Sequence, residues 1–178
     1  MEDDFIQYFD IKIHWTKDTD GCGNTMVDDF IDATQAISED KKFNNVLEWC
    51  SGPGFWGFGL LATGIANKVT LADIYEPTQI PVLQTIKENN LQDPYVAHYD
   101  DPRKYKDLDW SIHKNFFNNV NNYLTDDGII VLAENVWGSN PDTFQDMITD
   151  NNLQITHHFV SKQYPLDMWY LGITRLHH

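Results

Sequence analysis

The hydrophobic pattern alternates between short apolar runs, typical of buried strands, and longer stretches with apolar residues at helical spacing. Strands are predicted at residues 45–50, 68–73 and 129–133. Helices are predicted at residues 55–66, 77–90, 111–124 and 141–150, the second with Ile80, Leu83 and Ile86 as its inner stripe. Strands alternating with helices predict an α/β fold: a doubly wound, mostly parallel sheet with helices on both faces.

Both ends of the chain add further elements to this core. Ile11, Ile13 and Trp15 lie on one side of a short strand within residues 5–15, and a turn then leads into a helix near residue 26. At the other end, residues 154–160 and 168–175 predict an antiparallel pair of strands. Without a linker or an internal repeat, we expect one domain over residues 1–178, with an N-terminal strand, turn and helix cap (1–40) and a core (41–176).

The charge balance narrows the choice of partners. The chain has 12 Lys plus Arg against 27 Asp plus Glu, a formal net charge of −15. Its densest basic cluster is only Arg103, Lys104 and Lys106, whereas binding to phosphates needs many clustered cations. We therefore expect a small-molecule or protein partner. A nucleic acid is disfavoured but not excluded, because a small basic groove can lie in an acidic surface.

The sequence also bears on location. The first residues are acidic where a secretory signal would be basic, and no apolar run approaches the ~18 residues that span a bilayer. Cys22 and Cys50 are too few for a disulfide framework. We expect a cytoplasmic protein with reduced thiols and no membrane partner.

The most informative segment is residues 48–57, which read EWCSGPGFWG. Gly52 and Gly54 are predicted to form a tight turn after a strand, and Gly57 to permit close packing of the next helix on the sheet. The glycines also fit the G-x-G-x-x-G pattern of phosphate-binding loops. However, Pro53 removes one of the backbone donors that a pyrophosphate would need.

An acidic residue follows the glycines at the sequence separation typical of a nucleotide-binding site. Asp73 ends the second predicted strand, 73 − 52 = 21 residues after Gly52, the separation at which a carboxylate meets a ribose. Both a dinucleotide and the adenosine of S-adenosylmethionine contain this group, so ribose recognition alone does not choose between them.

Together, residues 46–55 and 71–73 resemble the first two motifs of class I, Rossmann-like S-adenosylmethionine-dependent methyltransferases. The resemblance spans the fold pattern of residues 26–176 and implies a sheet that ends in an antiparallel hairpin, as the last two predicted strands suggest. It implies that Glu48 orients the turn near the methionine moiety, that Asp73 binds the ribose, and that Ile74 lies against the adenine. The cofactor-binding residues that it implies are Glu48, Cys50, Ser51, Gly52, Pro53, Gly54, Asp73 and Ile74.

One region departs from the family. The sheet of this family needs two more strands before the strand at 129–133, yet residues 91–110 of this chain contain no apolar β-branched run. The two central strands are therefore expected to be missing, in a reduced variant or through the loss of about 25 residues just before Asp93. Asp93-Pro94-Tyr95 resembles a shortened Asn/Asp-Pro-Pro-Tyr/His motif of amino-methylating enzymes, which implies that these residues position a planar nitrogen for methylation. An ordinary turn is the alternative interpretation.

These observations favour an S-adenosylmethionine-dependent enzyme that methylates a nitrogen of a small molecule or of a protein side chain. The alternatives are an inactive relative that binds a partner or the nucleoside, and an NAD(P)-dependent oxidoreductase, which Pro53 disfavours. His98 and His113 are expected to be solvated rather than catalytic. His157 and His158 are neighbours on a strand and face opposite sides, so we predict no metal site.

Overall fold

The computed structural model describes residues 4–20, 23–91, 96–98 (backbone alone), 109–161, 163 and 168–177. Contacts divide the chain into two compact units. The first unit comprises residues 1–32 and 41–102, and the second comprises residues 33–40 and 103–178. Helix α1 (Val27–Ser38) contributes its first half to the first unit and its second half to the second.

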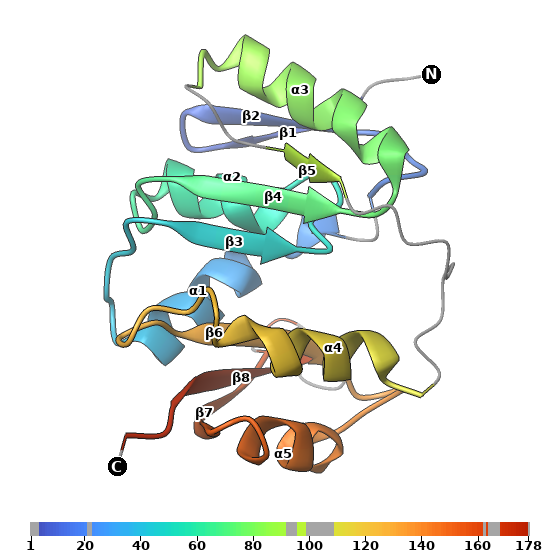
Figure 1. Cartoon of the computed structure of the whole chain (residues 1–178). Coiled ribbons are helices and arrows are strands. Elements are labelled where there is room, and N and C mark those ends of the chain that lie inside the picture. The colour runs from blue at the N-terminus through green and yellow to red at the C-terminus, as the bar shows by residue number, and fades with distance from the viewer. Residues whose placement is uncertain are drawn as a thin grey trace. The chain divides into compact units, whose positions relative to one another are not determined.

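The first unit carries the elements that surround the glycine turn (Figure 1). In chain order they are β1 (Asp4–Tyr8), β2 (Ile11–Trp15), η1 (Gly23–Thr25), β3 (Val46–Trp49), α2 (Phe55–Ala62), β4 (Val69–Asp73), η2 (Glu76–Thr78), α3 (Gln79–Glu88) and β5 (Val96–His98). Strands β3, β4 and β5 form a parallel sheet in that order. The strand, turn, helix, strand order expected from the sequence is therefore confirmed.

Strand β5 corrects one expectation, because a strand does exist between residues 91 and 110. It pairs with β4 in parallel, with Val96 opposite Leu71 and His98 opposite Asp73. The run is only three residues long and reads VAH, too short and too weakly apolar for a hydrophobic pattern to reveal. Pairing with the buried strand β4, rather than intrinsic propensity, accounts for it.

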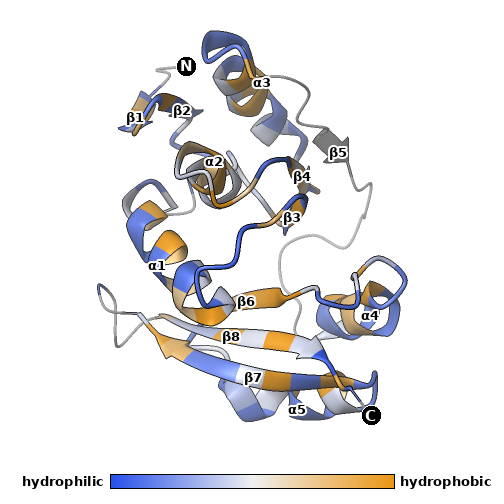
Figure 2. Cartoon of the chain, turned by 90° about the vertical axis from the view of Figure 1, so that its left-hand side faces the viewer, coloured by the Kyte–Doolittle hydropathy of each residue, from blue (hydrophilic) through white to orange (hydrophobic). Residues whose placement is uncertain are grey.

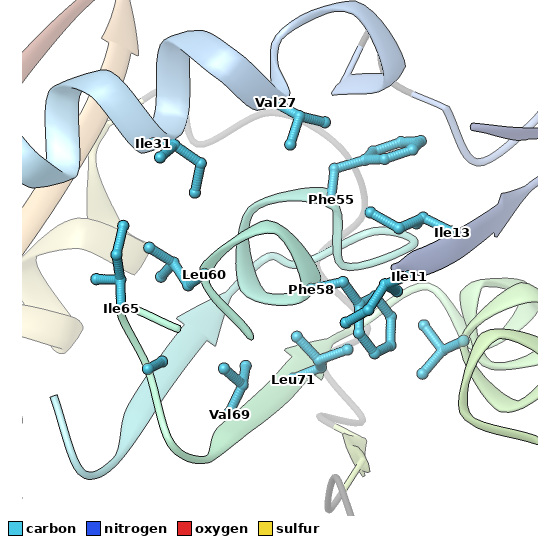
Figure 3. Close-up of a cluster of buried hydrophobic side chains, with 12 residues drawn as sticks. Ile11, Ile13, Val27, Ile31, Phe55, Phe58, Leu60, Ile65, Val69 and Leu71 are labelled. Atoms are coloured by element: carbon cyan, nitrogen blue, oxygen red, sulfur yellow. The ribbon is translucent and has the colours of Figure 1, made fainter. Parts of the chain in front are cut away.

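The core of the first unit lies around α2 (Figure 3). Phe58 and Leu60 of α2 are buried together with Val69 and Leu71 of β4. The N-terminal hairpin closes the same cluster through Ile11, which is buried as the sequence predicted. Burying aliphatic and aromatic side chains of this size stabilises a fold by about 1.5–3 kcal/mol each.

Helix α3 presents a different face from the one predicted. Its buried residues are Pro81, Val82 and Thr85, whereas Ile80 and Leu83 are 55% and 54% exposed. The predicted inner stripe is therefore wrong for these two residues. The physical reason is that α3 packs against β2 through a mixed face, in which Val82 joins the apolar core and Thr85 bonds to the hairpin.

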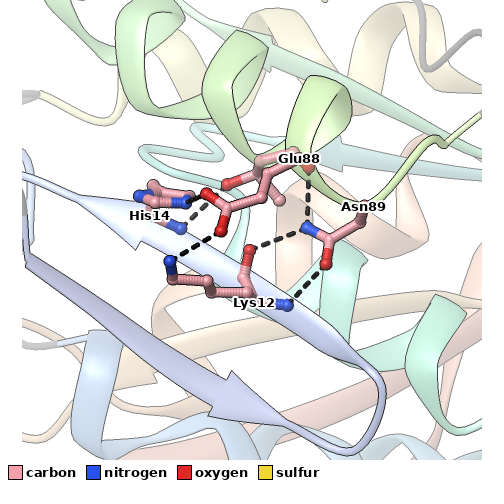
Figure 4. A network of polar contacts seen from close by, with 5 residues as sticks. Lys12, His14, Glu88 and Asn89 are labelled. Carbon is pink, nitrogen blue, oxygen red and sulfur yellow. Dashed lines mark hydrogen bonds and ion pairs between the residues drawn. The ribbon is translucent and has the colours of Figure 1, made fainter.

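This polar contact joins α3 to the outer edge of β2 (Figure 4). The carboxamide of Asn89 accepts a hydrogen bond from the Lys12 N–H at 2.8 Å and donates one to the Lys12 carbonyl at 2.8 Å, as a neighbouring strand would. Thr85 Oγ1 accepts the His14 N–H at 2.8 Å. Glu88 binds both Lys12 and His14 side chains, at 2.7 and 2.6 Å. The edge of the hairpin is thereby satisfied by side chains rather than by another strand.

The second unit is an antiparallel sheet with two helices. Its elements are α4 (Ser111–Val120), β6 (Ile130–Asn135), α5 (Pro141–Thr149), β7 (Leu153–Val160) and β8 (Met168–Arg175), and the strand order is β6-β8-β7. The predicted C-terminal antiparallel hairpin is confirmed as the β7–β8 pair. Strand β6 is largely hydrophobic (Figure 2). A second core gathers Phe117, Phe144, Ile148, Trp169 and Leu171.

No helix in the described ranges is long and apolar enough to cross a membrane.

Candidate cofactor site

The turn between β3 and α2 needs residues that tolerate a left-handed backbone. Gly52 and Gly54 have φ values of +53° and +82°, as predicted for a tight glycine turn. Cys50 shares this conformation, with φ of +58°, although it carries a side chain. Its strain lies immediately beside the candidate site.

Close packing also requires glycine at two positions of this turn and helix. A Cβ on Gly54 would lie 2.6 Å from Leu71 Cδ1. A Cβ on Gly57 would lie 2.6 Å from Val69 Cγ1 and 2.7 Å from Glu48 Oε2. The prediction that Gly57 lets α2 approach the sheet closely is confirmed, and the absence of a side chain there also makes room for the Glu48 carboxyl group.

Glu48 reaches from β3 to the first turn of α2. Its Oε2 accepts a hydrogen bond from the Gly57 N–H at 2.7 Å. Burial raises the pKa of Glu48 to about 8; N–H groups of Gly57 and Trp56 act in the opposite direction, and the charge of Asp73 adds to the rise. Glu48 thus links strand to helix while holding its proton near neutral pH.

Asp73 closes the turn from the neighbouring strand. Its Oδ2 accepts the Gly52 N–H at 2.7 Å and its Oδ1 accepts the Tyr75 N–H at 2.7 Å. A carboxylate has about four acceptor positions, so these two bonds leave others for a ligand hydroxyl. The structure therefore brings Glu48, Gly52 and Asp73 together at the carboxyl ends of β3 and β4, where open α/β sheets bind ligands.

Most backbone donors of the turn are already occupied. The N–H groups of Ser51 and Gly54 donate to the carbonyls of Ala72 and Ser51, at 3.1 and 2.8 Å. Those of Gly52 and Gly57 donate to the two carboxylates, and Pro53 has no N–H. A phosphate site needs N–H groups directed at the anion, so the turn offers carboxylate acceptors instead of an anion cradle.

The other predicted cofactor residues lie around this centre. Cys50 and Ile74 are exposed, Ile74 by 43%, which leaves both able to meet a ligand. Ser51 and Pro53 are buried, and Ser51 helps to pin the end of β3 to β4. Both residues help to shape the turn, and their predicted contact with a cofactor stays a prediction.

Thr19 and Gly23 lie beside the turn, in or next to the stretch 20–25, for which the sequence suggests either a segment that closes over the cofactor or a plain helix cap. The Thr19 carbonyl oxygen is 3.5 Å from the place of a Cβ on Gly52, and Gly23 packs closely on the Phe55 ring. Thr16 and Thr19 are buried and bond to each other. Gly21 and Gly23 favour a turn in this stretch of the sequence, and its closure over a cofactor stays a prediction.

The predicted catalytic residues Asp93, Pro94 and Tyr95 lie outside the described residues. The next described residue, Val96, begins β5. In the motif that the tripeptide resembles, the strand comes before the tripeptide rather than after it. The chain order around β5 therefore gives this assignment no added support, and it stays a prediction.

In the second unit, His113 corrects a second expectation, because it is not a solvated side chain. Its Nε2 lies 2.9 Å from Glu134 Oε1, and the two side chains are only 14% and 18% exposed. The rings of Trp110 and Phe144 each lie with their centroids 5.1 Å from that of His113. A glutamate directly after the apolar run 129–133 was the available signal, since a carboxylate at such a position needs a partner.

The carboxyl end of β6 borders a shallow cavity of about 340 Å³. It is lined by Val136, Ser139, Asn140, Pro141, His158, Val160, Met168 and Trp169. Next to this cavity, the Asn135 side chain accepts hydrogen bonds from the Trp137 and Gly138 N–H groups, and Trp137 is 82% exposed. No group of three or more potential metal ligands occurs in the described part of the chain.

The fold and the two-carboxylate turn define an α/β protein of the Rossmann-like type. Its fold is similar to that of solved structures of S-adenosylmethionine-dependent and other methyltransferases. No protein-family model matches the chain, and no curated protein matches it in sequence.

Three of the similar structures illustrate the match. Trm5b from Pyrococcus abyssi has a TM-score of 0.69 at 14% identity and covers 98% of this chain and 56% of its own. An S-adenosylmethionine-dependent methyltransferase from Clostridium acetobutylicum has a TM-score of 0.65 at 11% identity, covering 85% and 91%. A ribosomal protein L11 methylase from Lactobacillus delbrueckii has a TM-score of 0.63 at 16% identity, covering 87% and 81%. At these identities the likeness shows the fold.

Proposed function

We propose that this chain is an S-adenosylmethionine-dependent methyltransferase, with the cofactor at the carboxyl ends of β3 and β4. The observation that carries the proposal is the convergence of Glu48 and Asp73 on one glycine turn, at 2.7 Å from the Gly57 and Gly52 N–H groups. Acceptor oxygens suit the ribose hydroxyls and the positive charges of this cofactor. The similar methyltransferase structures support the same assignment.

The same geometry disfavours a nicotinamide dinucleotide. Its pyrophosphate is an anion that needs donor N–H groups, whereas the donors of Ser51, Gly52, Gly54 and Gly57 are already bonded within the protein.

The chemistry supplied by a bound S-adenosylmethionine is a methyl group on a sulfonium leaving group. The protein's own part, in this proposal, is to bind and orient. Asp73 holds the ribose, Glu48 fixes the turn beside the methionine moiety, and Ile74 covers the adenine. Asp93-Pro94-Tyr95 remain the proposed residues for positioning an acceptor nitrogen.

For the acceptor, we propose a small molecule or a protein side chain. Some similar structures are named for tRNA or for a ribosomal protein. A formal net charge of −15 makes a nucleic-acid acceptor the less favoured choice, because phosphates must be matched by clustered cations.

The first test is calorimetric titration of the full chain with S-adenosylhomocysteine, in parallel with NADH. We expect saturable binding of the nucleoside thioether alone, at micromolar concentration. Binding of NADH alone would replace the proposal with an oxidoreductase. Binding of the thioether without turnover of S-adenosylmethionine, measured over a panel of amine acceptors and peptides, would instead indicate an inactive relative that keeps the nucleoside site.

A further inference from the structure

The cavity at the carboxyl end of β6 lies wholly in the second unit and has an apolar lining. Its walls come from the turn between β6 and α5 and from the ends of β7 and β8, and none of the eight lining residues is Asp, Glu, Lys or Arg. Val160 of β7 lies opposite Trp169 of β8, so their side chains share one face of the sheet and form one wall. Val136 and Val160 are 44% and 47% exposed, so a partner can reach the cavity from solvent.

An exposed tryptophan extends this apolar surface. Trp137 follows Val136 in the turn and is 82% exposed, and its backbone N–H donates to the Asn135 side chain at 3.1 Å. Contiguous exposed apolar surface marks interaction sites, and tryptophan is enriched among the residues that carry most of the binding energy at interfaces. The cavity volume of about 340 Å³ lies near the lower end of the range for small-molecule pockets, about 300–1,000 Å³. Such a cavity suits a single apolar side chain of a larger partner.

Helix α5 begins at the rim of the cavity, where Pro141 is a lining residue, and adds a row of negative charge. Asp142, Asp146 and Asp150 follow one another at intervals of four residues, and all three are exposed. Side chains at this spacing lie on the same face of a helix. None of the three has an ion-pair partner in the part of the chain that the structure describes. Like charges four residues apart destabilise a helix, and an acid at its C-terminal end opposes the helix dipole, so helix stability does not account for the row.

From these two features we propose that the cavity, Trp137 and the acidic row of α5 form a docking surface for a basic protein segment with an apolar anchor side chain. The anchor enters the cavity beside Trp137, and lysine or arginine side chains of the segment lie along Asp142 and Asp146. The formal net charge of −15 attracts a basic partner over a longer range. The docking is independent of the proposed function, whereas the assignment of the docked segment as the methyl acceptor rests on it.

The experiment is an NMR titration of the isotope-labelled full chain with the peptide acetyl-KKFKK-amide, whose phenylalanine is the anchor. Acetyl-KKSKK-amide lacks the anchor, and acetyl-EEFEE-amide keeps the anchor but reverses the charge. We expect the basic aromatic peptide to shift the backbone N–H signals of Trp137 and Val160 in a saturable way. Its affinity should exceed that of either control peptide by about tenfold, the effect of one well-buried anchor at an interface.

Two variants with matched controls separate the apolar and the acidic parts of the surface. Trp137→Ala should weaken binding of acetyl-KKFKK-amide about tenfold, whereas Tyr123→Ala, at a side chain that is 83% exposed outside the cavity lining, should not. Asp146→Asn should weaken it about two- to fivefold, as expected for an exposed ion pair. Asp126→Asn, at an exposed acid in the turn before β6, removes the same charge elsewhere and should leave the affinity unchanged. All four positions are exposed, so the fold should be retained.

The other outcomes overturn the docking surface. Equal affinity for the serine peptide would remove the role of the cavity, and equal affinity for the acidic peptide would remove that of the α5 row. Phenethylamine bound as tightly as acetyl-KKFKK-amide would make the cavity a small-molecule site, and no binding of any peptide would contradict the proposal outright. Titration of the same sample with S-adenosylhomocysteine tests the proposed function separately, since its failure beside intact peptide docking would overturn the methyltransferase and leave the docking surface standing.

Discussion

Two strand-to-helix turns of this protein satisfy the N–H groups at the start of a helix in different ways. The turn before α5 is capped by its own residues. The Asn140 side chain accepts the Thr143 N–H at 3.2 Å, and Thr143 Oγ1 accepts the Asn140 N–H at 3.1 Å. Pro141 occupies the first helical position. The turn before α2 has Gly54 at its cap position, with no side-chain bond from that residue. Its first-turn N–H of Gly57 is bound instead by Glu48 from the preceding strand.

The difference indicates which turn is arranged for the proposed cofactor. A capping box satisfies a helix end with neighbouring residues and needs nothing else. The α2 turn instead uses two carboxyl groups from neighbouring strands, left-handed glycines and a strained cysteine. Such strain costs free energy and is typical of functional sites. Substitutions in the two turns test this contrast.

Gly57, which packs against the sheet, should be the position where a substitution lowers stability most. Gly57→Ala would place a Cβ 2.6 Å from Val69 and 2.7 Å from the Glu48 carboxyl group. We expect unfolding free energy to fall by about 2–3 kcal/mol through overpacking, measured by urea denaturation. Gly138→Ala in the other turn is the control, since its Cβ would meet nothing closer than 3.9 Å. Equal effects of the two changes would contradict the close packing of α2.

Removing the carboxylate of Asp73 should act mainly on the ligand. Asp73→Ala is expected to weaken binding of S-adenosylhomocysteine by about 1.5–3 kcal/mol, or roughly 10- to 150-fold, because charge-assisted bonds to the ribose are lost. Asn135→Ala removes the corresponding bonds of the other turn to the Trp137 and Gly138 N–H groups, and should leave that affinity unchanged. An unaltered affinity in Asp73→Ala would remove this residue from the site.

Glu48 should make stability depend on pH. Its folded-state pKa, about 8, lies above the ordinary value of 4.5. The folded chain therefore binds the Glu48 proton more tightly than the unfolded chain. The stability that this tighter binding contributes is fully present below about pH 4.5 and is lost as pH rises towards 8. Glu48→Gln has no such loss. It should be more stable than the unaltered chain by roughly 1–2 kcal/mol at pH 8.5, a figure reduced for solvent screening of a partly exposed side chain.

Thermal or urea unfolding from pH 5 to pH 9 checks this expectation. The advantage of Glu48→Gln should shrink as pH falls and be smallest near pH 5. A constant difference across the range would show that Glu48 is ionised throughout in the folded chain.

The sequence predicted those features that follow from local patterns. Apolar runs located β3, β4 and β6, and the glycines of the β3–α2 turn indicated left-handed backbone that the structure contains. The antiparallel pair β7–β8 followed from two clear β-rich runs. In each case the neighbours in sequence determine the conformation.

What the sequence did not reveal depends on distant partners. Strand β5 exists through its pairing with β4, and the orientation of α3 depends on Thr85 and Asn89, which bond to the edge of β2. The His113–Glu134 pair likewise joins residues 21 positions apart. Such contacts are tertiary, so neither periodicity nor propensity encodes them.

The smallest predicted effect concerns strain in the α2 turn. Cys50 has φ of +58°, a conformation that costs a residue with a side chain about 1–2 kcal/mol relative to glycine, while no residue from 135 to 141 has positive φ. Cys50→Gly should therefore stabilise the chain, by less than 1 kcal/mol because glycine also gains entropy in the unfolded state. Cys50→Ala retains the strain and should show no gain in the same urea denaturation series. A matching gain in both variants would attribute the effect to the thiol, and the contrast between a strained and a relaxed turn would lose this support.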